Sequence, residues 1–284
     1  SNAVKTIGVL TSGGDAPGMN AAIRAVVRTG ISNGLNVKGI RRGYAGLLEE
    51  DIIDMNNLSV SDIIQTGGTI LYTARCLEFK KKEYQQKAAD ICRKHGIDGI
   101  VVIGGDGSFN GASRLSEQGI NTIGVPGTID LDIACTEYTI GFDTAINTAM
   151  EAIDKLRDTS ESHERCSVVE VMGRTAGHIA LWTGIASGAE YILTTEKYHG
   201  DIQRIISKIQ DRRKLGKKNH IIVNAEGVGN SYQMAKDIEE ATGIETRATV
   251  IGHIQRGGNP SCRARVYASS MGAMAVDLLI AGKP

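Results

Sequence analysis

The chain has 284 residues, 41% of them apolar and 23% charged, which is typical of a globular protein and excludes a disordered one. Lys plus Arg and Asp plus Glu each number 32, so the zero net charge favours neither nucleic acid nor an acidic membrane as a partner. No apolar run reaches about 18 residues and no signal peptide is visible, so we expect neither a membrane span nor secretion.

Short apolar runs alternate with amphipathic segments along the chain. In chain order we predict a strand at 4–10, a helix at 19–32, a strand at 36–40, a helix at 82–94, strands at 99–103 and 121–125, a long helix at 139–158, strands at 167–171, 191–194, 220–224 and 246–251, and a helix at 264–280, with further helices between the later strands. Strand–helix alternation with almost no hairpin signal predicts parallel sheets covered by helices on both faces. The number of predicted strands is large for a single sheet, so we expect two α/β domains.

Glycine-bearing segments follow the predicted strands. Glycine accounts for 35 of the 284 residues, or about 12% of the chain, compared with a usual share of about 7%. Ligands of parallel α/β sheets bind at the carboxyl ends of the strands, so these segments are where we expect a site. They lie at 11–20, 104–108, 126–132, 172–177, 225–227 and 252–258.

Two of these segments have the features of a phosphate-binding loop. The glycines of the segments Gly13–Gly14 and Gly104–Ser108 expose backbone N–H groups, and a following helix N-terminus adds partial positive charge. The two loops could therefore hold one polyphosphate together. Asp106 would repel phosphate unless it serves Mg²⁺, which prefers carboxylate and phosphate oxygens. The alternative is a tight turn in which Asp106 is only the N-cap of a helix.

A pair of carboxylates and a set of cations complete the predicted chemistry. Asp130 and Asp132 share one face of an extended segment, which suggests one base and one supporting group, or else two capping residues. Guanidinium groups bind phosphate, although a lone arginine is usually a solvated surface residue. Together these features indicate phosphoryl transfer to a phosphorylated acceptor, without a Walker-type loop. The candidate cations are Arg75, Arg165, Arg174, Arg247, Arg256 and His253.

The ordered set of motifs resembles the ATP-dependent 6-phosphofructokinases of bacterial type. The stretches that carry the resemblance are LTSGGDAPGMNAAIR, TARCLEF, VVIGGDGS, PGTID, TIGFDTA, VEVMGR and GHIQRGG. The resemblance implies a cytoplasmic glycolytic enzyme, a homotetramer that transfers the ATP γ-phosphoryl to the 1-hydroxyl of fructose 6-phosphate. It also implies two Rossmann-like three-layer α/β/α domains with mostly parallel sheets. Residues 1–141 and 256–284 would form the nucleotide-binding domain, and residues 142–255 the sugar-phosphate-binding domain.

The resemblance also implies residue roles. Asp130 would accept the proton, Arg174 would neutralise transition-state charge, and Thr128 and Asp132 would support them. ATP would contact Gly14, Arg75, Cys76, Gly105, Gly107 and Ser108, with Asp106 at Mg²⁺. The sugar phosphate would be surrounded by Thr128, Ile129, Asp130, Asp132, Met172, Gly173, Arg174, Glu226, His253, Ile254, Gln255 and Arg256, with Arg165 and Arg247 reaching it from a neighbouring subunit. An effector site for ADP or phosphoenolpyruvate would involve Arg24, Arg28, Arg157, Gly188, Glu190 and Lys217.

The phosphoryl donor is indicated by two glycines. Pyrophosphate-using relatives carry Asp at the position of Gly107 and Lys at that of Gly127. A carboxylate at 107 would crowd and repel the ATP α-phosphate, so both glycines favour ATP. The chain departs from the family pattern at Leu131, where asparagine is usual.

Three alternatives follow from the sequence. One is a catalytically impaired family member that acts as a nucleotide-binding regulatory subunit, suggested by Leu131. Another is a kinase of the wider superfamily that phosphorylates NAD or a lipid. A dehydrogenase is the weakest, because no Gly-x-Gly-x-x-Gly follows the first strand. The five cysteines are scattered without a Cys-x-x-Cys pair, which favours reduced thiols in a cytosolic protein.

Overall fold

The computed structural model describes residues 3–131, 138–174 and 177–282 and divides the chain into two units. The first unit comprises Ser1–Ile129, Ile133–Asp143 and Arg256–Pro284. The second comprises Asp130–Asp132 and Thr144–Gln255. The chain therefore passes from one unit to the other between Ile129 and Asp130, inside the segment with the predicted carboxylates.

The first unit is built on a five-stranded sheet in the order β3-β2-β1-β4-β5. Its strands are β1 (Thr6–Thr11), β2 (Asn36–Ile40), β3 (Ile52–Met55), β4 (Gly99–Gly104) and β5 (Asn121–Pro126). All neighbours are parallel except β3, which pairs antiparallel with β2 at the edge. Every residue of β1 and β4 is buried, as expected for apolar central strands covered on both faces.

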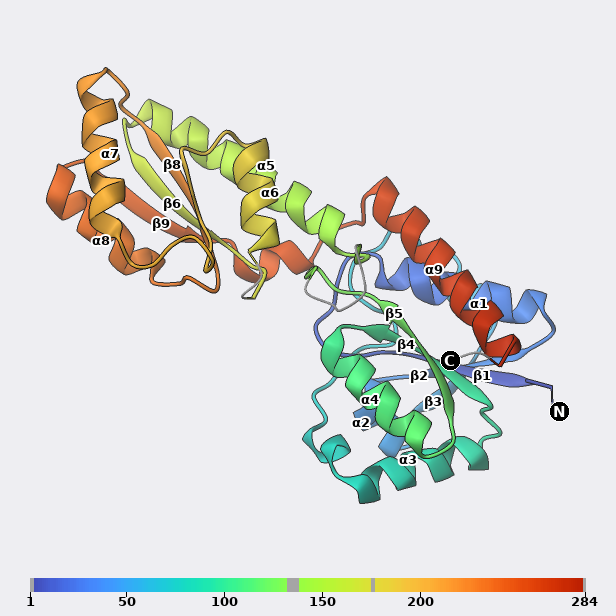
Figure 1. Ribbon diagram of the computed structural model, residues 1–284. Helices are drawn as coiled ribbons and strands as arrows, with labels where there is room; N and C mark the ends of the chain where they lie inside the picture. The colour runs from blue at the N-terminus through green and yellow to red at the C-terminus, as the bar shows by residue number, and fades with distance from the viewer. Residues whose placement is uncertain (1–2, 132–137, 175–176, 283–284) are drawn as a thin grey trace. The chain divides into compact units, whose positions relative to one another are not determined.

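Helices cover both faces of this sheet (Figure 1). On one face, α1 (Met19–Ser32) packs against α9 (Cys262–Ile280). Small residues permit this close packing, since a Cβ on Gly272 would lie 2.8 Å from the backbone oxygen of Ala22. The other face carries α2 (Gly43–Leu48), α3 (Lys82–Lys94) and α4 (Asp106–Glu117), with short 3₁₀ segments η1 (Leu58–Val60) and η2 (Leu77–Lys80) in the connections.

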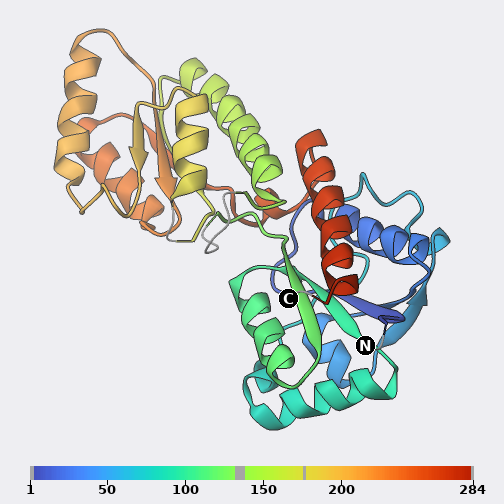
Figure 2. The same cartoon turned by 45° about the vertical axis from the view of Figure 1, so that its right-hand side comes forward.

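The second unit is built on a four-stranded, fully parallel sheet in the order β7-β8-β6-β9. Its strands are β6 (Cys166–Val171), β7 (Tyr191–Leu193), β8 (His220–Ala225) and β9 (Thr246–Val250). One face carries α5 (Phe142–Ser162) and α6 (His178–Ala186), and the other carries α7 (Ile202–Lys214) and α8 (Ser231–Thr242), as Figures 1 and 2 show. The 3₁₀ segment η3 (Gly252–Arg256) follows β9.

The predicted fold class is confirmed: both sheets are mostly parallel, and each lies between two layers of helices. The helices predicted at 19–32 and 82–94 have the predicted bounds, and the long helix begins at Phe142, three residues later than expected. The antiparallel strand β3 was not predicted, because it has only four residues at the edge of the sheet and shows no regular alternation of apolar and polar residues. Within the described residues, no helix is long and apolar enough to cross a membrane.

Candidate functional site

The two glycine loops of the first unit lie against each other, because β1 and β4 are parallel neighbours whose carboxyl ends meet. The N–H of Ser12 donates to the carbonyl oxygen of Ile103 at 3.0 Å. A Cβ on Gly104 would lie 2.6 Å from the backbone oxygen of Ser12, so only glycine fits there. A Cβ on Gly13 would lie 3.4 Å from Oγ of Ser108. The predicted adjacency of the two loops is therefore present in the structure.

The second glycine loop leads directly into α4. Gly105 is the residue before the helix and Asp106 is its first residue, so the interpretation of Asp106 as a side-chain N-cap is wrong. The first N–H groups of a helix have no intrahelical partner, and they attract anions. The exposed Asp106 and Gly107 stand beside these groups, and a Cβ on Gly107 would meet nothing within 4 Å. This end of α4 has room for a phosphate chain.

A divalent cation fits this loop only together with its substrate. Among the described residues, no group of three or more His, Cys, Asp or Glu side chains is arranged to hold a metal ion. Asp106 is exposed at the helix N-terminus and could supply one carboxylate oxygen. Mg²⁺ typically binds through one or two carboxylates, with water and substrate phosphates completing the shell. Asp106 beside a phosphate loop fits that pattern.

Tyr44 is a site residue that the sequence reasoning missed. Its side chain is buried, its ring stacks on Phe79 with centroids 4.3 Å apart, and its hydroxyl donates to the carbonyl oxygen of Ser108 at 2.5 Å. Burial raises the pKa of the Tyr44 hydroxyl, which keeps it neutral. A Cβ on Gly111 would lie 2.6 Å from the Tyr44 ring. The available signal was its place shortly after β2, at the same edge as the glycine loops.

The segment with Arg75 and Cys76 is fastened to the first glycine loop. The hydroxyl of Thr73 donates to the carbonyl oxygen of Gly13 at 2.7 Å, and that of Thr11 donates to the carbonyl oxygen of Tyr72 at 3.0 Å. These bonds bring the exposed Arg75 to the carboxyl edge of the sheet. Cys76 is half-buried, and burial raises the pKa of its thiol, which disfavours a reactive thiolate.

Arg256 lies against the first glycine loop of its own unit. A Cβ on Gly14 would be 2.9 Å from Nη1 of Arg256, so the guanidinium rests directly over the glycine backbone. The same η3 segment carries His253 and Ile254, both exposed, whereas Gln255 is fully buried. Arg256 is thus a cation beside the predicted polyphosphate loop.

The segment after β5 runs alongside the second glycine loop. The N–H of Gly127 donates to the carbonyl oxygen of Gly104 at 3.0 Å, and that of Gly141 donates to the carbonyl oxygen of Thr128, also at 3.0 Å. A Cβ on Gly127 would lie 2.6 Å from Cγ2 of Ile103, so a longer side chain has no space. Ile129 is buried in the core. The predicted Asp132 lies outside the described residues, as does Cys135.

In the second unit, Asp130 and Arg174 form an ion pair. The Nε atom of Arg174 is 3.2 Å from Oδ2 of Asp130. The Asp130 side chain is only 10% exposed, whereas that of Arg174 is 62% exposed. The two residues come from loops after β5 and β6, so the predicted base and the predicted phosphate-binding cation are brought together.

The loop after β6 is held by side chains from the segments that follow the two neighbouring strands, β8 and β9. The N–H of Met172 donates to Oε1 of Gln255 at 2.7 Å. The N–H groups of Gly173 and Arg174 donate to the Glu226 carboxylate at 3.1 and 2.9 Å. Met172, Gly173, Arg174, Glu226 and Gln255, predicted together on the sugar phosphate, are thus one connected group.

Arg165 and Arg247 lie at the other end of this sheet. Both pair with Glu245, at 3.3 Å from Arg165 and 2.9 Å from Arg247. Arg165 precedes β6 and Arg174 follows it, and six residues of strand span about 20 Å. These two arginines therefore cannot share a ligand with Arg174 of the same chain.

Four of the predicted effector residues gather in the second unit. Arg157 donates to the carbonyl oxygen of Gly188 at 3.2 Å and lies 3.9 Å from Glu190, whose carboxylate pairs with Lys217 at 2.8 Å. Burial alone would raise the pKa of Glu190, but hydrogen bonds from Lys217 and the N–H of Ile221 outweigh it and lower that pKa. Arg24 and Arg28 lie on α1 of the first unit.

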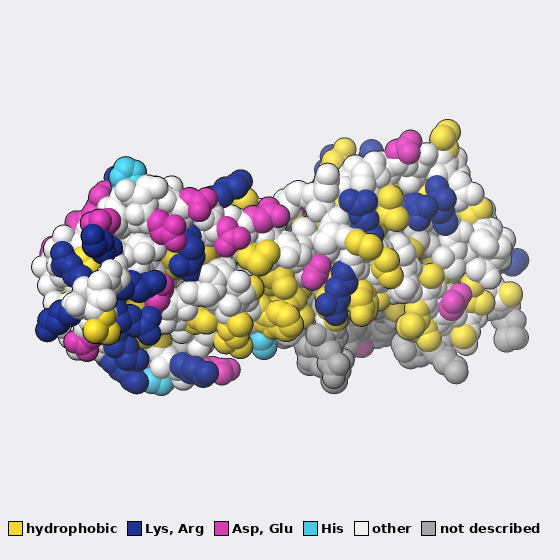
Figure 3. Space-filling view, turned by 90° about the horizontal axis from the view of Figure 1, so that it is seen from above, with side chains coloured by type: hydrophobic (Ala, Val, Ile, Leu, Met, Phe, Trp, Pro, Cys, Tyr) yellow, Lys and Arg dark blue, Asp and Glu magenta, His cyan; other side chains and the backbone are white. Residues whose placement is uncertain are grey.

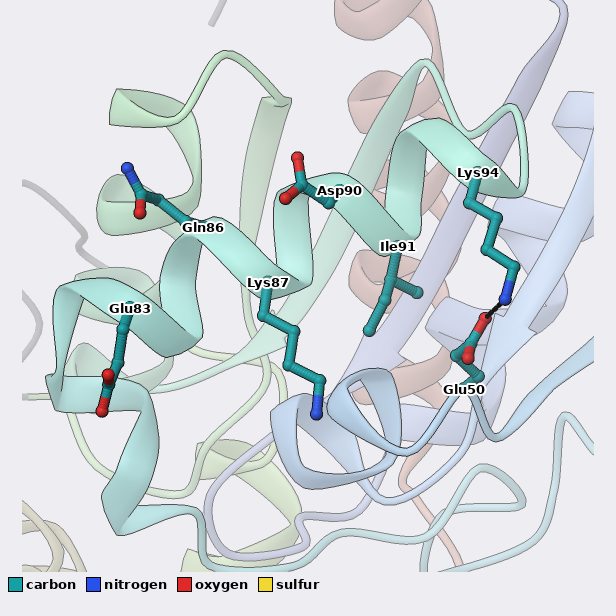
Figure 4. A pocket seen from close by; sticks show the side chains of 7 residues that line it. All are labelled: Glu50, Glu83, Gln86, Lys87, Asp90, Ile91 and Lys94. Carbon is teal, nitrogen blue, oxygen red and sulfur yellow. Dashed lines mark ion pairs between the residues drawn. The ribbon is translucent and has the colours of Figure 1, made fainter.

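The first unit also has a surface groove of about 380 Å³. Figure 4 shows its lining, in which Glu83, Lys87, Asp90 and Lys94 project from α3 and Glu50 pairs with Lys94 at 2.8 Å. None of the predicted site residues lines it, and its charges are mixed. The groove therefore does not mark the site.

Comparison with known proteins identifies the family. A family model described as phosphofructokinase matches residues 6–279. The ATP-dependent 6-phosphofructokinase of Clostridium botulinum (strain Hall) is 62% identical over 281 residues, 99% of this chain and 88% of that protein. The enzyme of the same name from Clostridium acetobutylicum is 60% identical over 280 residues, with the same two coverages.

Solved structures agree with the sequence matches. Phosphofructokinase from Saccharomyces cerevisiae has a TM-score of 0.90 and 38% identity over 99% of this chain, which spans 42% of that chain. Pichia pastoris phosphofructokinase in the T-state has a TM-score of 0.91 and 34% identity over 99% of this chain and 33% of its own. A pyrophosphate-dependent phosphofructokinase from Marinobacter aquaeolei has a TM-score of 0.85 and 25% identity, covering 99% and 77%. The chain belongs to the phosphofructokinase family.

Proposed function

We propose that this chain is an ATP-dependent 6-phosphofructokinase of glycolysis. It transfers the γ-phosphoryl of ATP to the 1-hydroxyl of fructose 6-phosphate and releases fructose 1,6-bisphosphate and ADP. The observation that carries the proposal is the 62% identity to enzymes of that name over 99% of the chain. The donor preference agrees with Gly107, where a side chain would project into open space at the phosphate loop.

The proposed chemistry gives separate roles to the acceptor, the base and the cations. The acceptor hydroxyl oxygen attacks the γ-phosphorus as the bond from that phosphorus to the β–γ bridging oxygen breaks, and the hydroxyl proton passes to the Asp130 carboxylate. Arg174, whose guanidinium already contacts Asp130, neutralises the charge that develops on the transferred group. The N–H groups at the start of α4 and in the Gly13–Gly14 loop bind the donor phosphates.

Magnesium is proposed as the metal. Asp106 would hold it at the N-terminus of α4, where the ion would supply positive charge that offsets the negative charge of the ATP phosphates. Since Asp106 offers a single carboxylate among the described residues of this loop, removal of the ion should weaken ATP binding far more than protein stability.

A homotetramer is proposed because one chain cannot complete the sugar-phosphate site. Arg165 and Arg247 stand at the amino end of their sheet, so they could reach a phosphate only in a neighbouring copy. The second unit also carries exposed apolar side chains on α6, and Figure 3 shows such side chains on its surface. The α6 residues concerned are Leu181, Trp182 and Ile185.

An effector site is proposed around Glu190. Arg157 and Lys217 supply two cations beside the Gly188 backbone, which suits an anionic effector such as ADP or phosphoenolpyruvate. Arg24 and Arg28 would come from another copy.

A coupled ADP-release assay with fructose 6-phosphate tests the reaction, with ATP and then pyrophosphate as donor. We expect turnover with ATP and little with pyrophosphate. Turnover only with pyrophosphate would overturn the donor assignment. No turnover with either donor, with ATP binding retained, would instead favour the impaired regulatory subunit.

Mixing two inactive variants tests the shared site. Asp130→Asn and Arg247→Ala chains should each be inactive alone. When they are dissociated and reassembled together, some sites receive both native residues and activity returns. A mixture that stays inactive although light scattering shows mixed tetramers would contradict the subunit-sharing proposal.

A further inference from the structure

The turn that carries Arg174 lies at the centre of its sheet. Strand β6 has β8 on one side and β9 on the other. The hydrogen-bond ladder continues past the strand ends, with the N–H of Glu226 donating to the carbonyl oxygen of Val171 and that of Ile251 to the carbonyl oxygen of Glu170. Each flanking strand is therefore followed by a segment held close to the turn.

This turn has a backbone conformation that its sequence alone does not favour. Gly173 has φ 141° and Arg174 has φ 54°, in the left-handed region. A non-glycine residue adopts that region only where its surroundings hold it there. The three N–H groups of Met172, Gly173 and Arg174 are all taken up by two side chains, those of Gln255 and Glu226.

The two side chains differ in what else they can touch. Glu226 is exposed, so its carboxylate can also meet a ligand in solution. Gln255 is 0% exposed, and its Oε1 is already used by the N–H of Met172. Its Nε2 is buried without a hydrogen-bond partner among the residues that the structure describes. Gln255 is enclosed in the protein, which does not fit the direct sugar-phosphate contact that the motif suggested.

We propose that Gln255 is a positioning residue for Arg174. Its amide oxygen fixes Met172 at the start of the turn, Glu226 fixes the next two residues, and the resulting left-handed turn aims the Arg174 guanidinium at Asp130. This inference rests on the transition-state role proposed above for Arg174. It assigns to Gln255 an effect on turnover that acts only through that arginine.

Gln255→Met tests the proposal, because methionine has a similar length and volume but no hydrogen-bond acceptor. A displacement of a catalytic group by about 1 Å can cost on the order of 10²-fold in rate. We therefore expect kcat to fall by about 10- to 100-fold, with a larger effect on kcat than on the KM for fructose 6-phosphate. Gln255→Glu keeps a hydrogen-bond acceptor oxygen at the same position and should therefore retain most of the parent kcat.

The decisive readout is a double-mutant cycle with Arg174→Ala. If Gln255 acts through Arg174, adding Gln255→Met to Arg174→Ala causes little further loss. If the kcat of the double variant falls by the product of the two single losses, or if Gln255→Met changes only KM, the proposal is overturned and Gln255 is an independent ligand contact. An unchanged kcat in Arg174→Ala alone would refute the role proposed for that arginine. The single variant therefore distinguishes a failure of the proposed function from a failure of the inference about Gln255.

Two controls separate positioning from misfolding. Gln233→Met makes the same chemical change at an exposed position of α8, where the side chain bonds only to Asp237 in the described structure, and should leave kcat unchanged. Gln255→Asn is one methylene too short to reach Met172 and should reproduce the loss. The ATP dissociation constant, which reports on the first unit, should stay the same in every Gln255 variant, and a kcat loss seen only together with weakened ATP binding would count against the proposal.

Discussion

Arg174 is paired with Asp130, with 3.2 Å between Nε and Oδ2. The carboxylate is nearly buried and the guanidinium is largely exposed, so the arginine has the greater freedom to move when a substrate arrives. A sugar hydroxyl that approaches Asp130 would meet an acceptor whose charge is already balanced. The pair thus joins the proposed base to the proposed transition-state cation.

Asp130→Asn should remove the proton acceptor with little change in shape. We expect kcat to fall by about 10²- to 10⁴-fold, the usual contribution of a general base. Steady-state kinetics with saturating ATP and fructose 6-phosphate would measure it. Because Asp130 belongs to the second unit, ATP affinity measured by calorimetry should stay within about twofold. A variant that keeps more than about a tenth of the parent kcat would exclude Asp130 as the base.

Gly107→Asp should change the choice of donor. The added carboxylate would project into the open space beside the phosphate loop, where it repels the ATP α-phosphate. We expect the KM for ATP to rise by about tenfold or more, measured with fructose 6-phosphate held saturating. Gly107→Ala, which adds bulk without charge at the same point, should have a much smaller effect. An unchanged KM for ATP in the aspartate variant would argue against the donor assignment.

Gly111→Ala should destabilise the first unit. Its Cβ would lie 2.6 Å from the Tyr44 ring, which stacks on Phe79 and bonds to Ser108 and therefore has little room to shift. Overpacking of this kind costs about 1–3 kcal/mol in the free energy of unfolding, measurable by urea denaturation. Gly107→Ala lies on the same helix with open space around its Cβ, so it should be neutral or slightly stabilising. Equal stability of the two variants would contradict the packing argument.

His220 should make the stability of the protein sensitive to acid. It is 0% exposed, and both ring nitrogens lack a hydrogen-bond partner in the described part of the chain. Burial lowers the pKa of His220 below its usual 6.5; nearby Lys217, Arg212 and Arg213 lower it further, and Glu190 opposes them. Protons then bind the unfolded chain more readily than the folded one, so stability is full above about pH 6.5 and falls as the pH decreases.

The contribution of His220 is measured by comparing unfolding free energies at pH 7.5 and pH 5.5. His220→Leu, which cannot titrate and leaves no unpaired nitrogen, should lose less stability over that interval than the parent. His199→Gln, a change at an exposed histidine, should behave like the parent. An equal loss in the parent and in His220→Leu would show that other groups cause the acid sensitivity.

Much of the fold could be predicted because its central strands are bare apolar runs. Residues 99–103 contain no polar side chain, and β4 is fully buried between two helical layers. The antiparallel β3 could not be predicted, since it is short and pairs with β2 at the edge of the sheet, and only Met55 of its four residues is buried. The pairing of an edge strand with its neighbour is decided by the tertiary structure, and the local pattern of apolar residues in the sequence does not contain that information.

The parts of the site that follow strands could also be predicted, because parallel topology brings strand ends together. Gly13, Gly104 and Ser108 meet as expected on that rule. Tyr44 could not be found in this way, because its role depends on a stacking partner in η2 and a carbonyl oxygen in α4. Gln255 was placed in the right loop, but its burial depends on side-chain packing that the motif does not reveal.

The position of β6 between β8 and β9 has a consequence for engineering this enzyme. A mutagenesis library restricted to ligand contacts would omit Gln255, although a change there is expected to alter turnover. Conversely, acceptor specificity is best redesigned at loop positions that do not support this turn. Directed evolution should therefore keep Glu226, which follows β8, and Gln255, which follows β9, constant while it varies the other loop positions.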